Sequence, residues 1–139
     1  MMTPRQMMIA TSVVAVLGAG LFYWNRSQGV DGRHGSAAIE PVIPELTSPA
    51  RAGEVVFDER CASCHGQDAV GTDQGPPLIH KYYEPGHHGD QAFVMAATRG
   101  VRAHHWNFGD MPPVAGITAD EIASVIAYVR EVQAANGIQ

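Results

Sequence analysis

Hydrophobic residues are distributed in two different ways along this chain of 139 residues. Near the N-terminus, residues 7–24 read MMIATSVVAVLGAGLFYW and contain no charged side chain. Near the C-terminus, apolar residues recur at the spacing of one helix face, at Ile122, Val125, Ile126 and Val129. No segment alternates convincingly between apolar and polar positions as a half-buried strand does. The pattern therefore predicts an all-α protein preceded by one long apolar segment.

The apolar N-terminal segment is close to the length of about 20 residues that crosses a lipid bilayer. Tyr23 and Trp24 end it, and aromatic side chains gather at the membrane surface. We therefore predict a transmembrane anchor within residues 1–25. A cleaved signal peptide is the alternative, with small residues near Ala19 as the cleavage site, and a buried helix is a weaker one. The apolar run continues past Ala19, which favours the anchor.

Residues 26–47 have the composition of a linker, because Gly and Pro interrupt them and no apolar period survives. We predict a flexible segment here. The alternative is a strap that packs on the domain surface through four apolar side chains, Ile39, Val42, Ile43 and Leu46.

Residues 48–139 are predicted to form about three main helices joined by long loops. The first helix would run from Ser48 as N-cap, with Pro49 at the first helical position, to about Arg60. A second helix would be capped by Asp90 and end before a glycine, at residue 99.

The third helix has the clearest start signal in the chain. Thr118 and Glu121 stand three residues apart ahead of the apolar helical period, in the pattern of a capping box. Gly137 follows the end of that period.

The charge balance argues against a nucleic-acid-binding protein. The whole chain carries nine basic and fourteen acidic side chains, for a net charge of −5. From Arg51 onward there are six basic and eleven acidic side chains, so the C-terminal domain is acidic.

The motif that carries chemistry is Cys61-Ala62-Ser63-Cys64-His65. The spacing C-x-x-C-H is the attachment signal of c-type haem. Two thiols three positions apart can form thioethers with the two vinyl groups of one porphyrin. The imidazole of His65 is then placed to bind the iron as the proximal ligand. We expect one covalent haem c, attached through Cys61 and Cys64.

Other uses of a C-x-x-C pair remain open at this point. A redox dithiol is expected within a βαβ pattern, and no such strands are predicted. A zinc site would need histidines as further ligands, since the chain has only two cysteines. A plain disulfide is the third alternative.

The chain resembles the class I cytochromes c over about residues 50–135, and four features in the right order carry the resemblance. They are the C-x-x-C-H motif, Gly75-Pro76-Pro77-Leu78, Gly109-Asp110-Met111-Pro112-Pro113, and a closing helix that contains Tyr128. The resemblance implies an all-α cytochrome c-like domain around one haem. It also implies that the closing helix crosses the first helix at a small residue, here Gly53, near Phe57.

The resemblance also assigns roles to individual residues. It implies that the Pro76 carbonyl accepts a hydrogen bond from Nδ1 of His65, that Leu78 packs on the haem, and that Met111 is the second axial ligand. We further expect Trp106 to form part of the wall of the haem crevice, with Phe108 beside it.

Other side chains could compete for the second axial position. Met95 is the rival methionine, but it falls within the second predicted helix, which suits packing. Histidine is the other alternative, and five histidines follow the motif, at positions 80, 87, 88, 104 and 105. The pairs His87-His88 and His104-His105 would form a copper or zinc site if their loops meet. Alternatively, they face solvent or bond to loop backbone.

Together these expectations describe a one-electron carrier rather than an enzyme, with His65 and Met111 on the iron. Resemblance implies a bacterial inner-membrane protein with a cytoplasmic N-terminus and a periplasmic haem domain in a respiratory or photosynthetic chain. It suggests quinol–cytochrome c reductase as donor and a terminal oxidase, reaction centre or periplasmic reductase as acceptor. The alternatives are a fixed haem c subunit of a larger respiratory enzyme, and a haem sensor or gas-binding module.

Overall fold

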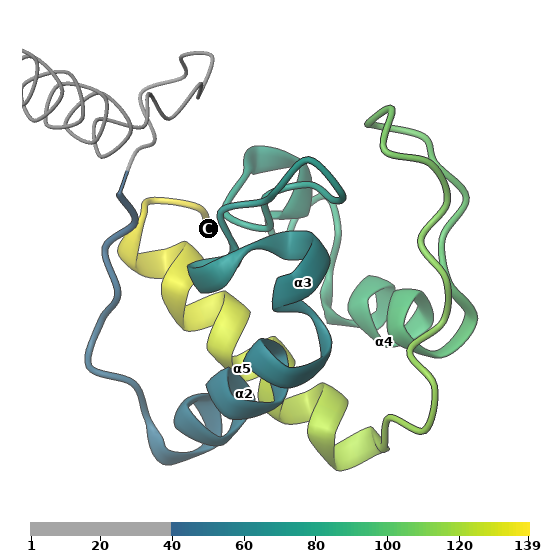
Figure 1. The fold of residues 1–139 in the computed structure, drawn as a ribbon. Coiled ribbons are helices and arrows are strands. Elements are labelled where there is room, and N and C mark those ends of the chain that lie inside the picture. The colour runs from purple at the N-terminus through teal and green to yellow at the C-terminus, as the bar shows by residue number, and fades with distance from the viewer. Residues whose placement is uncertain (1–39) are drawn as a thin grey trace, which may run out of the picture. The chain divides into compact units, whose positions relative to one another are not determined.

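The computed structural model describes residues 40–139, which form a helical domain (Figure 1). Within these residues there is no β-strand, only an isolated antiparallel bridge between Val101 and Met111. The helical fold expected from the sequence is thus confirmed for this part of the chain. Its elements in order are α2 (Ser48–Arg60), α3 (Ala62–His65), the 3-10 turns η1 (Gln67–Ala69) and η2 (Lys81–Tyr83), α4 (Asp90–Arg99) and α5 (Ala119–Ala135).

The centre of the fold is the crossing of α2 and α5, which is seen in Figure 1. Gly53 makes this crossing possible, because a Cβ atom there would lie 1.9 Å from the backbone oxygen of Ser124. Next to it, the rings of Phe57 and Tyr128 lie 5.3 Å apart and both are fully buried. The crossing at Gly53 that the resemblance implied is therefore present.

The helix boundaries agree with the sequence prediction, but two predicted caps were wrong. Thr47, not Ser48, is the N-cap of α2, and its hydroxyl donates to the Glu131 carboxylate on α5. Gly89, not Asp90, is the N-cap of α4, because the Asp90 carboxylate accepts from Arg130 at 2.8 Å. In both places a side chain that could cap its own helix instead makes a contact with α5, a hydrogen bond from Thr47 and an ion pair from Asp90.

The capping box at the start of α5 is confirmed. The Thr118 hydroxyl accepts from the backbone N–H of Glu121 at 3.2 Å, and the Glu121 carboxylate accepts from the backbone N–H of Thr118 at 2.7 Å. Two backbone donors that the first helical turn leaves unpaired are thereby satisfied.

Residues 40–47 of the predicted linker lie against α5. The side chain of Asn136 pairs with the backbone of Val42 through bonds of 2.9 and 2.8 Å, and Leu46 is buried. Part of the linker thus contacts the domain surface as the strap alternative required. Of its four apolar side chains, however, only Leu46 is buried, Val42 and Ile43 are exposed, and Ile39 lies outside the described residues. Residues 26–39 of the linker and the predicted anchor lie outside the described residues. None of the helices in residues 40–139 has the length and apolar character needed to cross a membrane.

Candidate functional site

A mainly apolar pocket lies between the C-x-x-C-H motif, α4, α5 and the loop before α5. The space between these elements is about 1050 Å³, part of which is open to solvent. Its mainly apolar lining is that of a site for a hydrophobic ligand. Six of the seven residues predicted to bind the cofactor line this pocket: Cys61, His65, Pro76, Leu78, Trp106 and Met111.

His65 is held in one orientation by the backbone of the following loop. Its Nδ1–H donates to the carbonyl of Pro76 over 2.9 Å. Because a carbonyl only accepts, this bond fixes the tautomer and leaves Nε2 with a free lone pair. Burial lowers the pKa of His65, and the hydrogen bond to Pro76 acts in the opposite direction. The imidazole is therefore prepared as a neutral ligand.

The two cysteines lie on one helical turn, which brings residues three apart to the same side. Cys61 is half-buried and lines the pocket, whereas Cys64 is exposed and is not among the lining residues. Burial raises the pKa of the Cys61 thiol to about 11, although the neighbouring Arg60 charge lowers it. Within residues 40–139, neither thiol belongs to a group of three or more side chains suited to hold a metal ion, which weighs against a zinc site at the motif.

The loop after the motif is tightly folded and strained. Asp68 and Ala69 both adopt positive φ, at 55° and 60°, which is unfavourable for residues with a Cβ atom. The Ala69 carbonyl accepts from the backbone N–H of Leu78 at 2.8 Å, which places Leu78 at the pocket wall. Neither residue is a glycine, so this strain was not expected from the sequence.

Met111 lines the pocket from the loop between α4 and α5. Its backbone N–H and C=O each bond to Val101 over 2.9 Å, and this pair closes the loop between them. Gly100 permits the close approach, because a Cβ atom there would lie 2.5 Å from the Met111 carbonyl oxygen. The rival Met95 lies on α4, is 37 % exposed and does not line the pocket.

Trp106 gives a test of whether haem fits this pocket. Its ring packs near Phe108 and against His80, with centroids 6.0 and 5.0 Å away. Its indole N–H is buried and has no hydrogen-bond partner among the described residues. A buried donor without an acceptor is unfavourable, so a ligand with an acceptor is expected beside it. Haem carries carboxylates as well as an apolar ring, and the residues present therefore fit it.

Several residues of the site were not predicted from the sequence. Phe93, Ala96 and Ala97 of α4 contribute to the apolar lining, as do three of the loop histidines: His88, His104 and His105. The spacing of apolar residues in α4 could have identified Phe93, Ala96 and Ala97 from the sequence. The two histidine pairs meet at this pocket, as one of the sequence-based alternatives required.

In the comparison with protein families, the profile described as Cytochrome c matches residues 50–133. Comparisons with curated proteins and with solved structures gave no match. The matched range runs from α2 through most of α5 and contains all seven predicted site residues.

Proposed function

Since this chain belongs to the cytochrome c family, whose members carry covalent haem c and generally transfer electrons, we propose that it is a one-electron carrier with six-coordinate haem. In this proposal His65 and Met111 are the axial ligands, and Cys61 and Cys64 form the two thioethers. The protein itself catalyses no bond chemistry.

One observation carries this proposal: His65 and Met111, from segments far apart in the sequence, line the same apolar pocket. His65 presents Nε2 because Nδ1 is bonded to Pro76. Met111 offers a soft, neutral sulfur atom, which favours a higher reduction potential than a second histidine would. With both positions filled, no exogenous ligand has open access to the iron.

When bound, haem c supplies the ferric–ferrous couple. The protein's residues orient it, exclude water and set its surroundings. The Pro76 carbonyl keeps the proton on Nδ1 of His65, Leu78 and Phe93 line the apolar pocket, and the indole N–H of Trp106 is available to a haem carboxylate.

The setting proposed for this carrier is the periplasmic face of a bacterial inner membrane. Residues 7–24 would anchor it in the bilayer, which keeps the haem domain near membrane partners at high effective concentration. Quinol–cytochrome c reductase is the proposed donor, and a terminal oxidase, reaction centre or periplasmic reductase is the proposed acceptor. The acidic domain predicts docking to surfaces that are not themselves strongly acidic.

Substitution of Met111 tests the ligand set, with Met95→Leu as the matched control. The haem-loaded wild type and the control should not bind carbon monoxide rapidly when ferrous, whereas Met111→Ala should bind it at once. Met111→His should restore six-coordination but lower the reduction potential, because imidazole replaces the thioether.

Two results would contradict the proposal. Rapid carbon monoxide binding by the ferrous wild type would mean an open iron site and favour a gas sensor. Equal spectra and potentials for wild type and Met111→Ala would mean that another residue, such as a loop histidine, is the ligand.

A further inference from the structure

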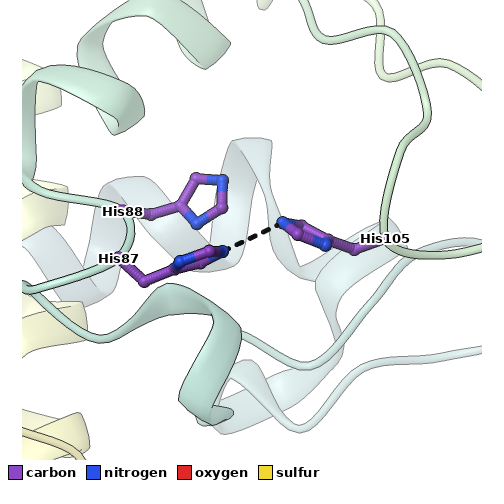
Figure 2. Close-up of side chains that lie close together, drawn as sticks. All are labelled: His87, His88 and His105. Carbon is purple, nitrogen blue, oxygen red and sulfur yellow. Dashed lines mark hydrogen bonds between the residues drawn. The ribbon is translucent and has the colours of Figure 1, made fainter.

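Four histidines from two separate loops converge at the edge of the pocket. His87 and His88 lie between η2 and α4, and His104 and His105 lie between α4 and α5. Figure 2 shows the rings of His87, His88 and His105 side by side. One ring nitrogen from each of these three lies within 4.8 Å of the others, and residues 40–139 contain no second group of this kind.

The nitrogen separations are those of ligands around one ion. In tetrahedral zinc sites the metal–nitrogen distance of 2.0–2.1 Å places two ligand nitrogens about 3.3 Å apart. Nε2 of His87 lies 3.3 Å from Nε2 of His105, and Nε2 of His88 lies 3.5 Å from Nε2 of His104. A histidine–histidine hydrogen bond would also explain the first distance, so the hydrogen-bond partners of the second pair are informative.

In the second pair, Nε2 of His88 faces Nε2 of His104, and neither of these atoms carries a proton when the rings are neutral. Nδ1 of His88 bonds to the carbonyl of Tyr82, and Nδ1 of His104 bonds to the carbonyl of Arg102 at 2.8 Å. Because carbonyls only accept, each Nδ1 carries the hydrogen and each Nε2 presents a lone pair. Two lone pairs directed at each other over 3.5 Å are stabilised by a cation beside them, either an added proton on one ring or a metal ion. A backbone carbonyl behind the second nitrogen is also the usual support of a metal-bound histidine.

The surrounding structure holds the rings in place. Arg130 of α5 donates to the backbone carbonyl of His88 over 2.7 Å, and the ring of Tyr82 stacks on that of His105 with centroids 4.6 Å apart. A site that is already formed requires less ordering when it binds its ion.

We propose that this histidine cluster binds one divalent first-row transition ion of the Cu²⁺ or Zn²⁺ class. His87, His88 and His105 are the ligands. His104 lies outside this group of three, with its Nε2 3.5 Å from Nε2 of His88. Imidazole suits both ions, and Cu²⁺ binds such ligands more tightly than Zn²⁺. This site is additional to the haem and does not depend on the axial ligands. The ion joins the two loops that frame one side of the haem pocket.

The test uses the full-length, haem-loaded protein, in which both cysteines are thioethers and do not compete for metal. Zn²⁺ and Cu²⁺ are titrated separately by calorimetry, and the copper sample is examined by electron paramagnetic resonance for coupling to imidazole nitrogen. We expect one ion per chain, with Cu²⁺ bound more tightly. His87→Ala/His105→Ala should weaken binding by more than about 100-fold, beyond the 10–100-fold effect of losing a ligand's hydrogen-bond partner.

Asn107→Ala, an exposed change on the same loop, is the matched control and should bind as the wild type does. His104→Ala, also at an exposed position, should weaken binding less than the double variant. Far-UV circular dichroism equal to that of the wild type shows that the fold of each variant is intact, and His105→Gln replaces the double variant if that one does not fold. Equal metal binding by wild type and a folded double variant, or no binding by the wild type in excess metal, would overturn the proposal.

Discussion

Two regions of the described domain are held together by different means. The helix-pair region comprises α2, α3, the loop to residue 79, and α5, and the pocket-loop region comprises residues 80–118. Every buried residue from α2 to the C-terminus belongs to the helix-pair region, including Phe57, Tyr128 and Val129, and none lies between residues 79 and 121.

The pocket-loop region is held instead by polar contacts and by the pocket it lines. Its backbone is fixed by the Val101–Met111 bridge, and its apolar side chains, such as Phe93, line the cavity. The difference indicates that the helix pair has a core of its own. Tyr83 and Phe93 of the pocket-loop region pack against this core but are only partly buried, and a bound haem would add to their apolar contacts. A domain of about ninety residues has a thin core, and a covalent apolar plate completes it.

Loss of haem should have the largest effect and should separate the two regions. In Cys61→Ala/Cys64→Ala we expect a largely unfolded protein without a sharp thermal transition. Whatever helix remains should lie in α2 and α5, since only these bury side chains against each other. Far-UV circular dichroism and residue-resolved hydrogen exchange are the measurements, and Ser63→Ala, between the two cysteines, is the control that keeps haem. Native dichroism with a cooperative transition in the haem-free variant would show that the pocket-loop region does not depend on haem.

Gly53→Ala should be the most damaging single change within the helix pair. The new Cβ atom would meet the backbone oxygen of Ser124 at 1.9 Å, so α2 and α5 must move apart. We expect a loss of about 3 kcal/mol in the free energy of unfolding, at the upper end for overpacked cores. Denaturant unfolding of the haem-loaded protein measures it. Ala52→Gly, exposed on the same helix, should lose only about 1 kcal/mol; an equal loss in both would refute the packing argument.

Arg130 joins the two regions, and its removal should have an intermediate effect. Its guanidinium donates to the carbonyls of Tyr83 and His88 and to the Asp90 carboxylate, at 2.6, 2.7 and 2.8 Å. Arg130→Met removes the donor to the His88 carbonyl and leaves the Tyr83 carbonyl with only the Gln133 amide as donor, at 3.1 Å. We expect a loss of about 2 kcal/mol. Faster hydrogen exchange should appear in α4 and the neighbouring loop, with α2 unchanged. Arg99→Met, at an exposed position, is the control; uniform acceleration across both regions would show that Arg130 does not join them.

The smallest effect is expected at the start of α5. Thr118→Ala removes one half of the capping box and should reduce the free energy of unfolding by about 1 kcal/mol. The hydrogen bonds from Thr118 lower the pKa of Glu121, with the nearby Arg60 charge contributing in the same direction. The ionised carboxylate therefore stabilises the folded state at neutral pH, and this contribution disappears as the pH falls below the ordinary carboxyl range and through the lowered pKa.

Glu121→Gln tests that pH dependence, because glutamine accepts the same hydrogen bond without a charge. The difference in unfolding free energy between wild type and Glu121→Gln should shrink as the pH is lowered from 7 to 3. A difference that stays constant over this range would show that ionisation of Glu121 does not contribute.

The sequence predicted the helix-pair region better than the pocket-loop region. Helix ends were predictable where the signal is local, as at Thr118 and Glu121, and so was the C-x-x-C-H turn. The two wrong caps were Ser48 and Asp90. At the first helix start the N-cap is Thr47, whose side chain bonds to Glu131 of α5, and at the second the Asp90 carboxylate bonds to Arg130 of α5. Competition of this kind arises only in the folded chain.

The pocket loops were harder to predict, since their residues follow no apolar period. Pro76 was placed correctly only because it belongs to a recognisable motif. The contact of His88 with His104, sixteen residues apart, depends on how two irregular loops fold back. Trp106 was expected at the pocket because it lies shortly before Met111 in the sequence. That its N–H has no hydrogen-bond partner was not expected.

The Val101–Met111 bridge has a consequence for rates. Its two hydrogen bonds close a loop that carries Met111 at one end and His104 and His105 within it. Such a loop opens as one unit, so a single opening event would withdraw the sulfur from the pocket and separate the two histidine pairs. If Met111 binds the iron and the histidine cluster binds an ion, as proposed above, then loss of the Met111 ligand and release of that ion would share one rate constant, set by the lifetime of this closed loop.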